Sequence, residues 1–200
     1  MIEVINITKE LKGIEVLSNI SYKFEDGKTY LITGPNGCGK TMLLRALCGL
    51  ITPTHGKVES DRPLNYGVVI ETPTFLNNET ALYNLKYLAS IQRKIGIKEI
   101  EDAMSKLDLL QFKKKKVKRF SLGMKQRLGI CQAIMENPDV LLLDEPFNAI
   151  DDENLIRVYD IINEFRNSGK IVIIASHGHI DTDRLIIDEN LQIKSGRLIL

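Results

Sequence analysis

GPNGCGKT, Gly34–Thr41, is the stretch that decides the fold, because it matches the pattern G-x-x-x-x-G-K-[ST]. It follows a run that predicts a β-strand and precedes a run that predicts a helix, which is the context this motif requires. Glycines let backbone N–H groups close around phosphate oxygens, and the helix N-terminus adds positive partial charge. In such a loop Lys40 neutralises the β- and γ-phosphates, and the Thr41 hydroxyl ligates Mg²⁺.

VLLLDEP, Val140–Pro146, supplies the acidic partner of this loop. Four apolar residues that end in two carboxylates predict a buried parallel strand whose C-terminal end faces a ligand crevice. Asp144 is suited to the Mg²⁺ shell, and Glu145 is suited to polarise a water for in-line attack on the γ-phosphate. The two motifs together predict a nucleotide site.

The composition is that of a globular protein with little net charge. The 200 residues include 27 basic and 26 acidic side chains, for a net charge of +1, so nucleic acid is not an expected partner. No apolar run approaches the roughly 20 residues of a membrane helix, and the N-terminus lacks the pattern of a signal peptide. Three unpaired cysteines, Cys38, Cys48 and Cys131, suit a reducing compartment, and we expect a cytoplasmic protein.

The order of β-rich and helical segments predicts an α/β fold. Runs rich in β-branched residues predict strands at 2–7, 16–24, 28–33, 56–60, 66–70, 139–144 and 170–176, with short strands and tight turns over 185–200. Asp26-Gly27 is a hairpin-type turn. Helical spacing predicts helices at 40–50 and 151–168 and a helical region from about 73 to 138.

FSLGMKQRLGI, Phe120–Ile130, completes a resemblance to the ATP-binding-cassette (ABC) ATPases that covers essentially the whole chain. The family's most diagnostic feature is an LSGGQ-type signature shortly before the acidic strand. Ser121 and Gly123 match its serine and second glycine, whereas Leu122 and Met124 replace the first glycine and the glutamine. By itself this stretch would be an ordinary helix start with Ser121 as its cap.

The resemblance also implies roles for individual residues. His177, at the end of IIASH, corresponds to the switch histidine that contacts the γ-phosphate, and it joins Glu145 as a predicted catalytic residue. Asp151, in NAID, corresponds to the aspartate of the loop that crosses between subunits. The residues expected to bind ATP are Gly34, Pro35, Asn36, Gly37, Cys38, Gly39, Lys40, Thr41, Met42, Ser121, Gly123 and Asp151.

The architecture implied by the resemblance is one nucleotide-binding domain over residues 1–200. A P-loop NTPase (RecA-like) core of about 1–72 and 138–200 carries an antiparallel β subdomain, and an α-helical subdomain of about 73–137 is inserted in it. Two copies, or one copy and a paralogous subunit, close head to tail over two ATP molecules. The position near Leu11, where relatives stack an aromatic ring on adenine, lacks an aromatic residue, which leaves ATP over GTP selectivity open.

GVVIETPTFL, Gly67–Leu76, places Glu71 where the family usually has glutamine. Together with SLGMKQR, this glutamate resembles the bacterial subgroup that exports bacitracin and lantibiotic peptides. We expect Glu71 to join Thr41 and Asp144 around Mg²⁺, because a carboxylate binds Mg²⁺ more strongly than an amide does. A charged residue at the surface end of a strand is the plainer alternative.

The leading interpretation is the ATPase subunit of an exporter of a peptide, antibiotic or other small molecule. It would dock on separately encoded membrane permease subunits at the inner face of the cell membrane. The alternative is a soluble cassette ATPase that acts in assembly, translation or repair, and a P-loop kinase or GTPase would leave SLGMKQR and His177 unexplained. The basic run Lys113–Arg119 predicts a solvated loop, with anionic lipid or a partner's acidic loop as other contacts.

Overall fold

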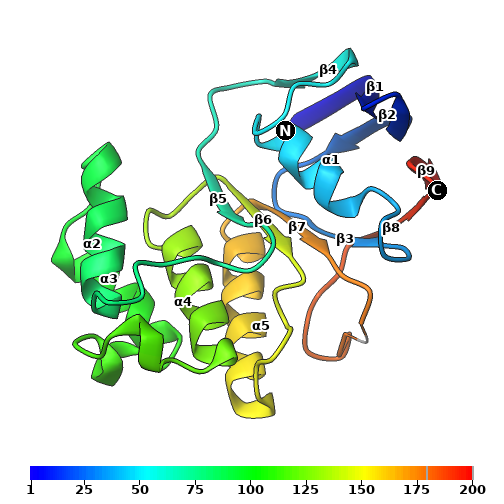
Figure 1. Cartoon of the computed structure of the whole chain (residues 1–200). Coiled ribbons are helices and arrows are strands. Elements are labelled where there is room, and N and C mark those ends of the chain that lie inside the picture. The colour runs from blue at the N-terminus through cyan, green and yellow to red at the C-terminus, as the bar shows by residue number, and fades with distance from the viewer. Residues whose placement is uncertain (179, 200) are drawn as a thin grey trace.

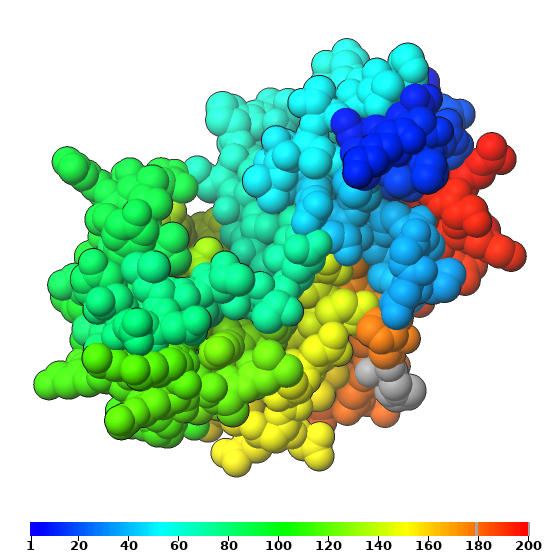
Figure 2. Space-filling view, in the orientation of Figure 1, coloured from blue at the N-terminus to red at the C-terminus, as the bar shows by residue number. Residues whose placement is uncertain are grey.

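The computed structural model describes residues 1–178 and 180–199, and within them two β-sheets and five α-helices form the fold (Figure 1). A six-stranded sheet forms the centre, and a smaller antiparallel sheet packs over one of its faces. Figure 2 shows the helical region, in green, on one side of the molecule and the N-terminal sheet, in blue and cyan, on the other. The α/β fold class with an antiparallel sheet and inserted helices is confirmed.

The central sheet brings the ends of its parallel strands to one edge. Its strands are, in spatial order, β5 (Tyr66–Val69), β6 (Val140–Asp144), β7 (Ile171–Ala175), β3 (Thr29–Thr33), β8 (Glu189–Lys194) and β9 (Arg197–Ile199). All neighbours are parallel except β8 and β9. The phosphate loop follows β3 and Asp144 ends β6, so the two predicted motifs meet at the same edge.

Both faces of this sheet are apolar, which explains the continuous hydrophobic runs in its strands. Val140 and Leu142 lie in one buried cluster, and Leu141 and Leu143 lie in the other. The first cluster joins the sheet to α1 (Lys40–Leu47) and the antiparallel sheet, and the second joins it to the remaining helices. Burial of each such side chain stabilises the fold by roughly 2 kcal/mol.

The antiparallel sheet has the order β2 (Ile14–Phe24), β1 (Ile2–Leu11) and β4 (His55–Ser60). Its hairpin turn is Lys12-Gly13, where both residues have positive φ, of 50° and 79°. The predicted hairpin at Asp26-Gly27 is wrong, because this turn joins β2 to β3, which belong to different sheets. β3 is buried along nearly its whole length, as is typical of a strand inside a parallel sheet, whereas only Leu17, Ile20 and Phe24 of β2 are buried.

The helical insertion consists of α2 (Ala81–Gln92), α3 (Ile97–Lys106), α4 (Leu122–Ile134) and two short 3₁₀ turns, η1 (Leu110–Phe112) and η2 (Val117–Arg119). It connects β5 to β6, which are neighbours in the sheet, so the helices form one excursion from the core. Thr80 and Ser121 cap α2 and α4, since each hydroxyl accepts a hydrogen bond from a backbone N–H three residues later. The limits of 73–137 for this lobe stay a prediction.

The remaining elements follow the sequence closely. α1 ends at Leu47 rather than near residue 50, because Gly49 adopts a φ of 73° just beyond it. α5 (Asp152–Asn167) begins after its cap Asp151, and Ser195-Gly196 forms the tight turn between β8 and β9. Leu200, the last residue of the predicted final strand, lies outside the described residues. Among the helices described, none has the length and apolar character to cross a membrane.

Candidate nucleotide site

The phosphate loop is built around the buried side chain of Lys40. Its Nζ donates hydrogen bonds to the carbonyl oxygens of Gly34 and Pro35, at 2.7 and 3.4 Å, so the loop wraps around the ammonium group. A Cβ on Gly34 would lie 2.2 Å from the carbonyl oxygen of Ile193, and Gly39 has a φ of 116°. Side chains at these two positions would therefore open the loop, which explains their glycines.

Thr41 and Asp144 form a hydrogen-bonded pair next to this loop. Oγ1 of Thr41 donates to Oδ2 of Asp144 at 2.7 Å and thereby connects the first turn of α1 to the end of β6. A hydrogen bond to a charged carboxylate stabilises by about 2 kcal/mol. Burial raises the pKa of Asp144, and the hydroxyl of Thr41 opposes that shift. A buried carboxylate beside a hydroxyl is a donor pair that a hard cation suits.

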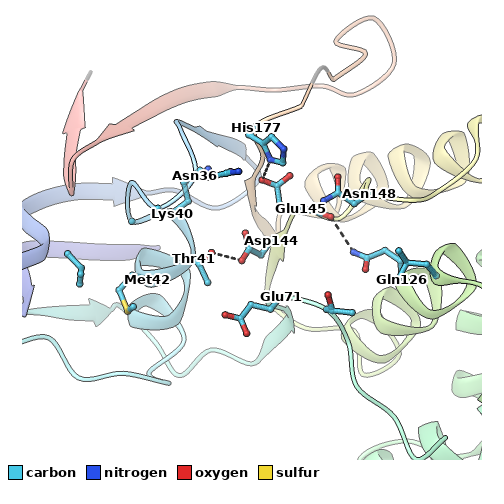
Figure 3. A pocket seen from close by; sticks show the side chains of 15 residues that line it. Asn36, Lys40, Thr41, Met42, Glu71, Gln126, Asp144, Glu145, Asn148 and His177 are labelled. Carbon is cyan, nitrogen blue, oxygen red and sulfur yellow. Dashed lines mark hydrogen bonds and ion pairs between the residues drawn. The ribbon is translucent and has the colours of Figure 1, made fainter. Parts of the chain in front are cut away.

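Glu145 and His177 form another pair of side chains in the site. Nδ1 of His177, which follows β7, lies 2.5 Å from Oε1 of Glu145. Glu145 adopts a φ of 48°, and its N–H donates to the carbonyl of Ala175 at 2.8 Å. This backbone turns the side chain away from the end of β6 and toward the histidine (Figure 3). The strained conformation is the kind that functional residues adopt.

These pairs line one cleft of about 530 Å³ (Figure 3). Lys40 and Thr41 project from the α1 side, and Asp144, Glu145 and His177 project from the ends of β6 and β7. Of the predicted residues the cleft is lined by Asn36, Gly37, Gly39, Lys40, Thr41, Met42, Glu71, Asp144, Glu145 and His177. Gly34, Pro35 and the buried Cys38 do not line the cleft, although the carbonyls of Gly34 and Pro35 accept hydrogen bonds from Lys40.

Glu71 lies at the rim of this cleft and bonds to a cation of the protein itself. Its Oε1 lies 2.7 Å from Nη2 of Arg45 on α1, and its side chain is 64% exposed. Glu71 also has a φ of 60°, just beyond the end of β5. The expected role at Mg²⁺ therefore competes with an ion pair to Arg45.

Ser121, Gly123 and Asp151 lie outside the cleft of their own chain. Oγ of Ser121 caps α4, and Oδ1 of Asp151 caps α5 by accepting the N–H of Asn154 at 3.1 Å. That hydrogen bond lowers the pKa of Asp151. A Cβ on Gly123 would lie 2.2 Å from the carbonyl oxygen of Ala149, so the two segments are in backbone contact.

The cleft includes residues to which the sequence analysis assigned no role. These residues are Val16, Thr72, Leu122, Gln126 and Asn148. Nε2 of Gln126 donates to the carbonyl of Glu145 at 3.3 Å, which connects α4 to the acidic strand end. In the sequence, Gln126 belongs to the Lys125-Gln126-Arg127 run that directly follows the signature, and this position could have indicated its role. Leu11 is 41% exposed at the end of β1, and Val16 of β2 lines the cleft instead.

The acidic and sulfur ligands of the described residues do not form a metal cage of their own. Within 1–178 and 180–199, no group of three or more His, Cys, Asp or Glu is arranged to hold a metal ion. Mg²⁺ in phosphate-transfer sites is commonly bound by one or two protein groups together with phosphates and water. The pair of Thr41 and Asp144 fits that pattern.

Comparison with known proteins identifies the family. The ABC transporter family matches residues 17–148, a range that contains the phosphate loop, the signature segment and the acidic strand. The chain belongs to the ABC transporter family. Relatives support this from end to end: the uncharacterised ABC transporter ATP-binding protein YybJ of Bacillus subtilis is 45% identical, and the match covers 99% of this chain and 94% of YybJ.

Two further ABC relatives have names that state a cargo. The lantibiotic transport ATP-binding protein SrtF of Streptococcus pyogenes is 34% identical, over 88% of this chain and 80% of SrtF. The bacitracin transport ATP-binding protein BcrA of Enterococcus faecalis is 35% identical, over 88% of this chain and 61% of BcrA. The predicted resemblance to this subgroup is confirmed.

Solved structures agree on the fold. The dimeric structure of MJ0796, described as a bacterial ABC transporter cassette, superposes with a TM-score of 0.89 at 24% identity, over all of this chain and 97% of MJ0796. The family match and the relatives show that the chain is an ATP-binding ABC subunit, and the superposition shows that it has the cassette ATPase fold, as predicted. The soluble alternative finds no support in these comparisons.

Proposed function

We propose that this chain hydrolyses ATP to power export of a peptide antibiotic or a similar small molecule through separately encoded membrane subunits. The observation that carries the proposal is the convergence of the Lys40 loop, the Thr41–Asp144 pair and the Glu145–His177 pair in one cleft. The names of SrtF and BcrA support the cargo class.

The cleft supplies the groups that phosphoryl transfer to water needs. Lys40 and the loop amides bind the β- and γ-phosphates. Glu145 accepts the proton of the attacking water while the bond between the γ-phosphorus and the bridging oxygen breaks and ADP leaves. His177 holds the Glu145 carboxylate and faces the γ-phosphate. Thr41 and Asp144 fit Mg²⁺, which neutralises phosphate charge when bound, and Glu71 lies at the same rim.

The signature residues support a dimer as the active form. Ser121, Gly123 and Asp151 lie outside the cleft of their own chain, so a second copy or a paralogous subunit has to present them to the bound ATP. Each closed dimer then holds two ATP molecules between head-to-tail chains. We expect no nucleic acid partner, because the net charge is only +1.

Exposed apolar residues on α2 support a membrane partner. Tyr83, Tyr87 and Ile91 repeat every four residues, which places them on one face, and their exposed fractions are 49%, 55% and 69%. An apolar stripe of this kind on a surface helix is typical of a protein interface. We assign this face to the permease subunits at the inner side of the membrane, with the ATPase peripheral in the cytoplasm.

ATPase assays of Glu145→Gln test the chemistry. The amide cannot accept a proton, so we expect turnover to fall by about 10³-fold while ATP binding is retained and a dimer accumulates. Glu59→Gln, on β4 and remote from the cleft, is the matched control. A Glu145→Gln protein as active as wild type would refute the assignment. Co-purification with a multi-spanning membrane protein of the native host tests the partner, and recovery of soluble complexes alone would favour the alternative.

A further inference from the structure

The turn between β8 and β9 lies behind the phosphate loop, although it is near the other end of the chain. The N–H of Gly196 donates to the carbonyl of Cys38 at 2.9 Å. The N–H of Ser18 on β2 donates to the carbonyl of Gly196 at 2.8 Å. One residue therefore connects the loop to β2 through both of its backbone groups, and Figure 1 shows β8 and β9 on the side of the molecule that carries β1 and β2.

Gly196 has no space for a side chain. Its φ is 77°, and a Cβ there would lie 2.9 Å from the carbonyl oxygen of Val16 and 3.3 Å from Cα of Leu17. A Cβ on Gly39 of the phosphate loop would lie 2.9 Å from the same oxygen of Val16. The turn, the loop and β2 are thus packed backbone against backbone, where a displacement cannot be absorbed by rotation of a side chain.

The contact with Cys38 controls the direction of one amide of the loop. A trans peptide is planar, with its C=O and N–H groups on opposite sides. Because Gly196 binds the carbonyl of Cys38 at the rear, the N–H of Gly39 in the same peptide points to the opposite side. Since Gly39 lines the cleft, we infer that this N–H faces the space for the phosphates.

We propose that Gly196 is a positioning residue for ATP, which orients the phosphate loop through the Cys38–Gly39 peptide. This inference rests on the proposed function, because it takes the β- and γ-phosphates of ATP as the ligand of the loop. A side chain at position 196 pushes the turn away from β2 and releases the Cys38 carbonyl. The loop then loses one well-aligned donor to a charged oxygen, which corresponds to about tenfold in affinity.

Gly169 supplies a matched control. It has the same φ of 77°, but no atom lies within 4 Å of the position of its Cβ. It lies before β7, at the opposite end of the strand from the cleft. Gly196→Ala and Gly169→Ala therefore share the strain of an alanine at positive φ, and they differ in contact with β2 and the loop.

The experiment measures Kd for the fluorescent analogue mant-ATP, the urea midpoint, and KM and kcat of ATP hydrolysis. We expect Gly196→Ala to weaken mant-ATP and to raise KM by about tenfold, with kcat within about twofold of wild type. Gly169→Ala should lower the urea midpoint by the positive-φ strain alone, and so by less than Gly196→Ala, and it should keep wild-type affinity. Equal affinity of the two variants would overturn the inference.

Inorganic tripolyphosphate, used as a competitor of mant-ATP, distinguishes an effect on the phosphate loop from an effect on contacts between the base and the part of the cleft that Val16 lines. It has no base, so it should lose the same factor as ATP, and an unchanged competition constant would overturn the role of the loop. If Gly196→Ala fails to fold, Gly196→Asn applies the same test, because asparagine tolerates positive φ better and still carries a Cβ. Wild-type protein that fails to bind mant-ATP would instead overturn the proposed function itself.

Discussion

The cleft around the phosphate loop and the signature segment differ in how their functional side chains are held. In the cleft, Thr41 bonds to Asp144 and Glu145 bonds to His177, so catalytic groups hold one another. In the signature segment, Ser121 caps a helix of its own chain, as Asp151 does at the start of α5. In the proposed dimer, one half of each ATP site is therefore assembled within a single chain, whereas the signature segment of the partner supplies the other half.

This difference separates two measurable quantities. ATP binding to the single chain, measured at protein concentrations too low for dimerisation, depends on the assembled half alone. Hydrolysis depends on both halves, so the turnover per chain should rise with protein concentration until all of the protein is dimeric. The predictions below use substitutions that act on one half at a time.

Lys40→Ala should have the largest effect on ATP affinity. The loop would lose the buried cation that Gly34 and Pro35 surround, so ATP affinity should fall by at least about 100-fold, as expected for a charge-assisted contact to phosphate. Equilibrium titration with mant-ATP measures this loss, with exposed Lys57→Ala on β4 as the control. Unchanged ATP affinity would contradict the assignment of ATP binding to the Lys40 loop.

Ser121→Ala should reduce turnover about tenfold and leave the ATP affinity of the single chain unchanged. The loss of the helix cap also lowers stability by about 1 kcal/mol. Thr80→Ala removes an equivalent cap on α2, since both hydroxyls accept a backbone N–H at 3.1 Å. If the two variants have the same turnover at saturating protein and ATP, Ser121 acts as a cap alone and the partner half is wrongly assigned.

Glu71→Gln tests the boundary between the two halves, because the chain runs from β5 through Glu71 into the helical insertion. The change removes the ion pair with Arg45 and a carboxylate near the metal. We expect ATP affinity close to wild type and a Mg²⁺ dependence of hydrolysis shifted by about 1 kcal/mol, or roughly fivefold. Arg45→Ala removes the ion pair and keeps the carboxylate. If Arg45→Ala shifts the Mg²⁺ dependence of hydrolysis as much as Glu71→Gln does, the effect comes from the ion pair and not from a carboxylate at the metal.

Asp144→Asn should have the smallest effect, on the stability of the nucleotide-free protein. Burial raises the pKa of Asp144, so the folded state binds the proton more tightly than the unfolded state. The stability from this group is present at low pH and is lost as pH rises through the raised pKa. The variant should therefore be more stable than wild type at pH 7, with a gap in urea midpoint that closes toward acid pH. Asp160→Asn, at an exposed position on α5, is the control.

Much of the cleft could be predicted from the sequence, because its motifs are local. A strand, a glycine-rich loop and a helix start occupy consecutive residues, and two carboxylates follow a run of four apolar residues directly. Each pattern specifies the residue at which its own strand ends and the loop begins. The parallel sheet then brings Thr41, Asp144 and His177 to one edge without further information.

The remaining features depend on contacts between distant segments. Asp26-Gly27 has the composition of a hairpin turn, but burial of β3 on both faces places its two strands in different sheets. The ion pair of Glu71 with Arg45 and the contact of Gly196 with Cys38 join segments that no local pattern relates. Such pairs follow from the packed core and could be found only in three dimensions.

The contact between Gly123 and Ala149 has a consequence for the kinetics of the enzyme. The two backbones touch, and Gln126 on the same helix donates to the carbonyl of Glu145, so a displacement of the signature segment would be transmitted to the end of β6. In the proposed dimer, ATP bound against one signature segment biases the carboxylate that activates water over the other ATP. The two sites are then energetically coupled. Velocity should rise sigmoidally with ATP, with a Hill coefficient above 1 and at most about 2.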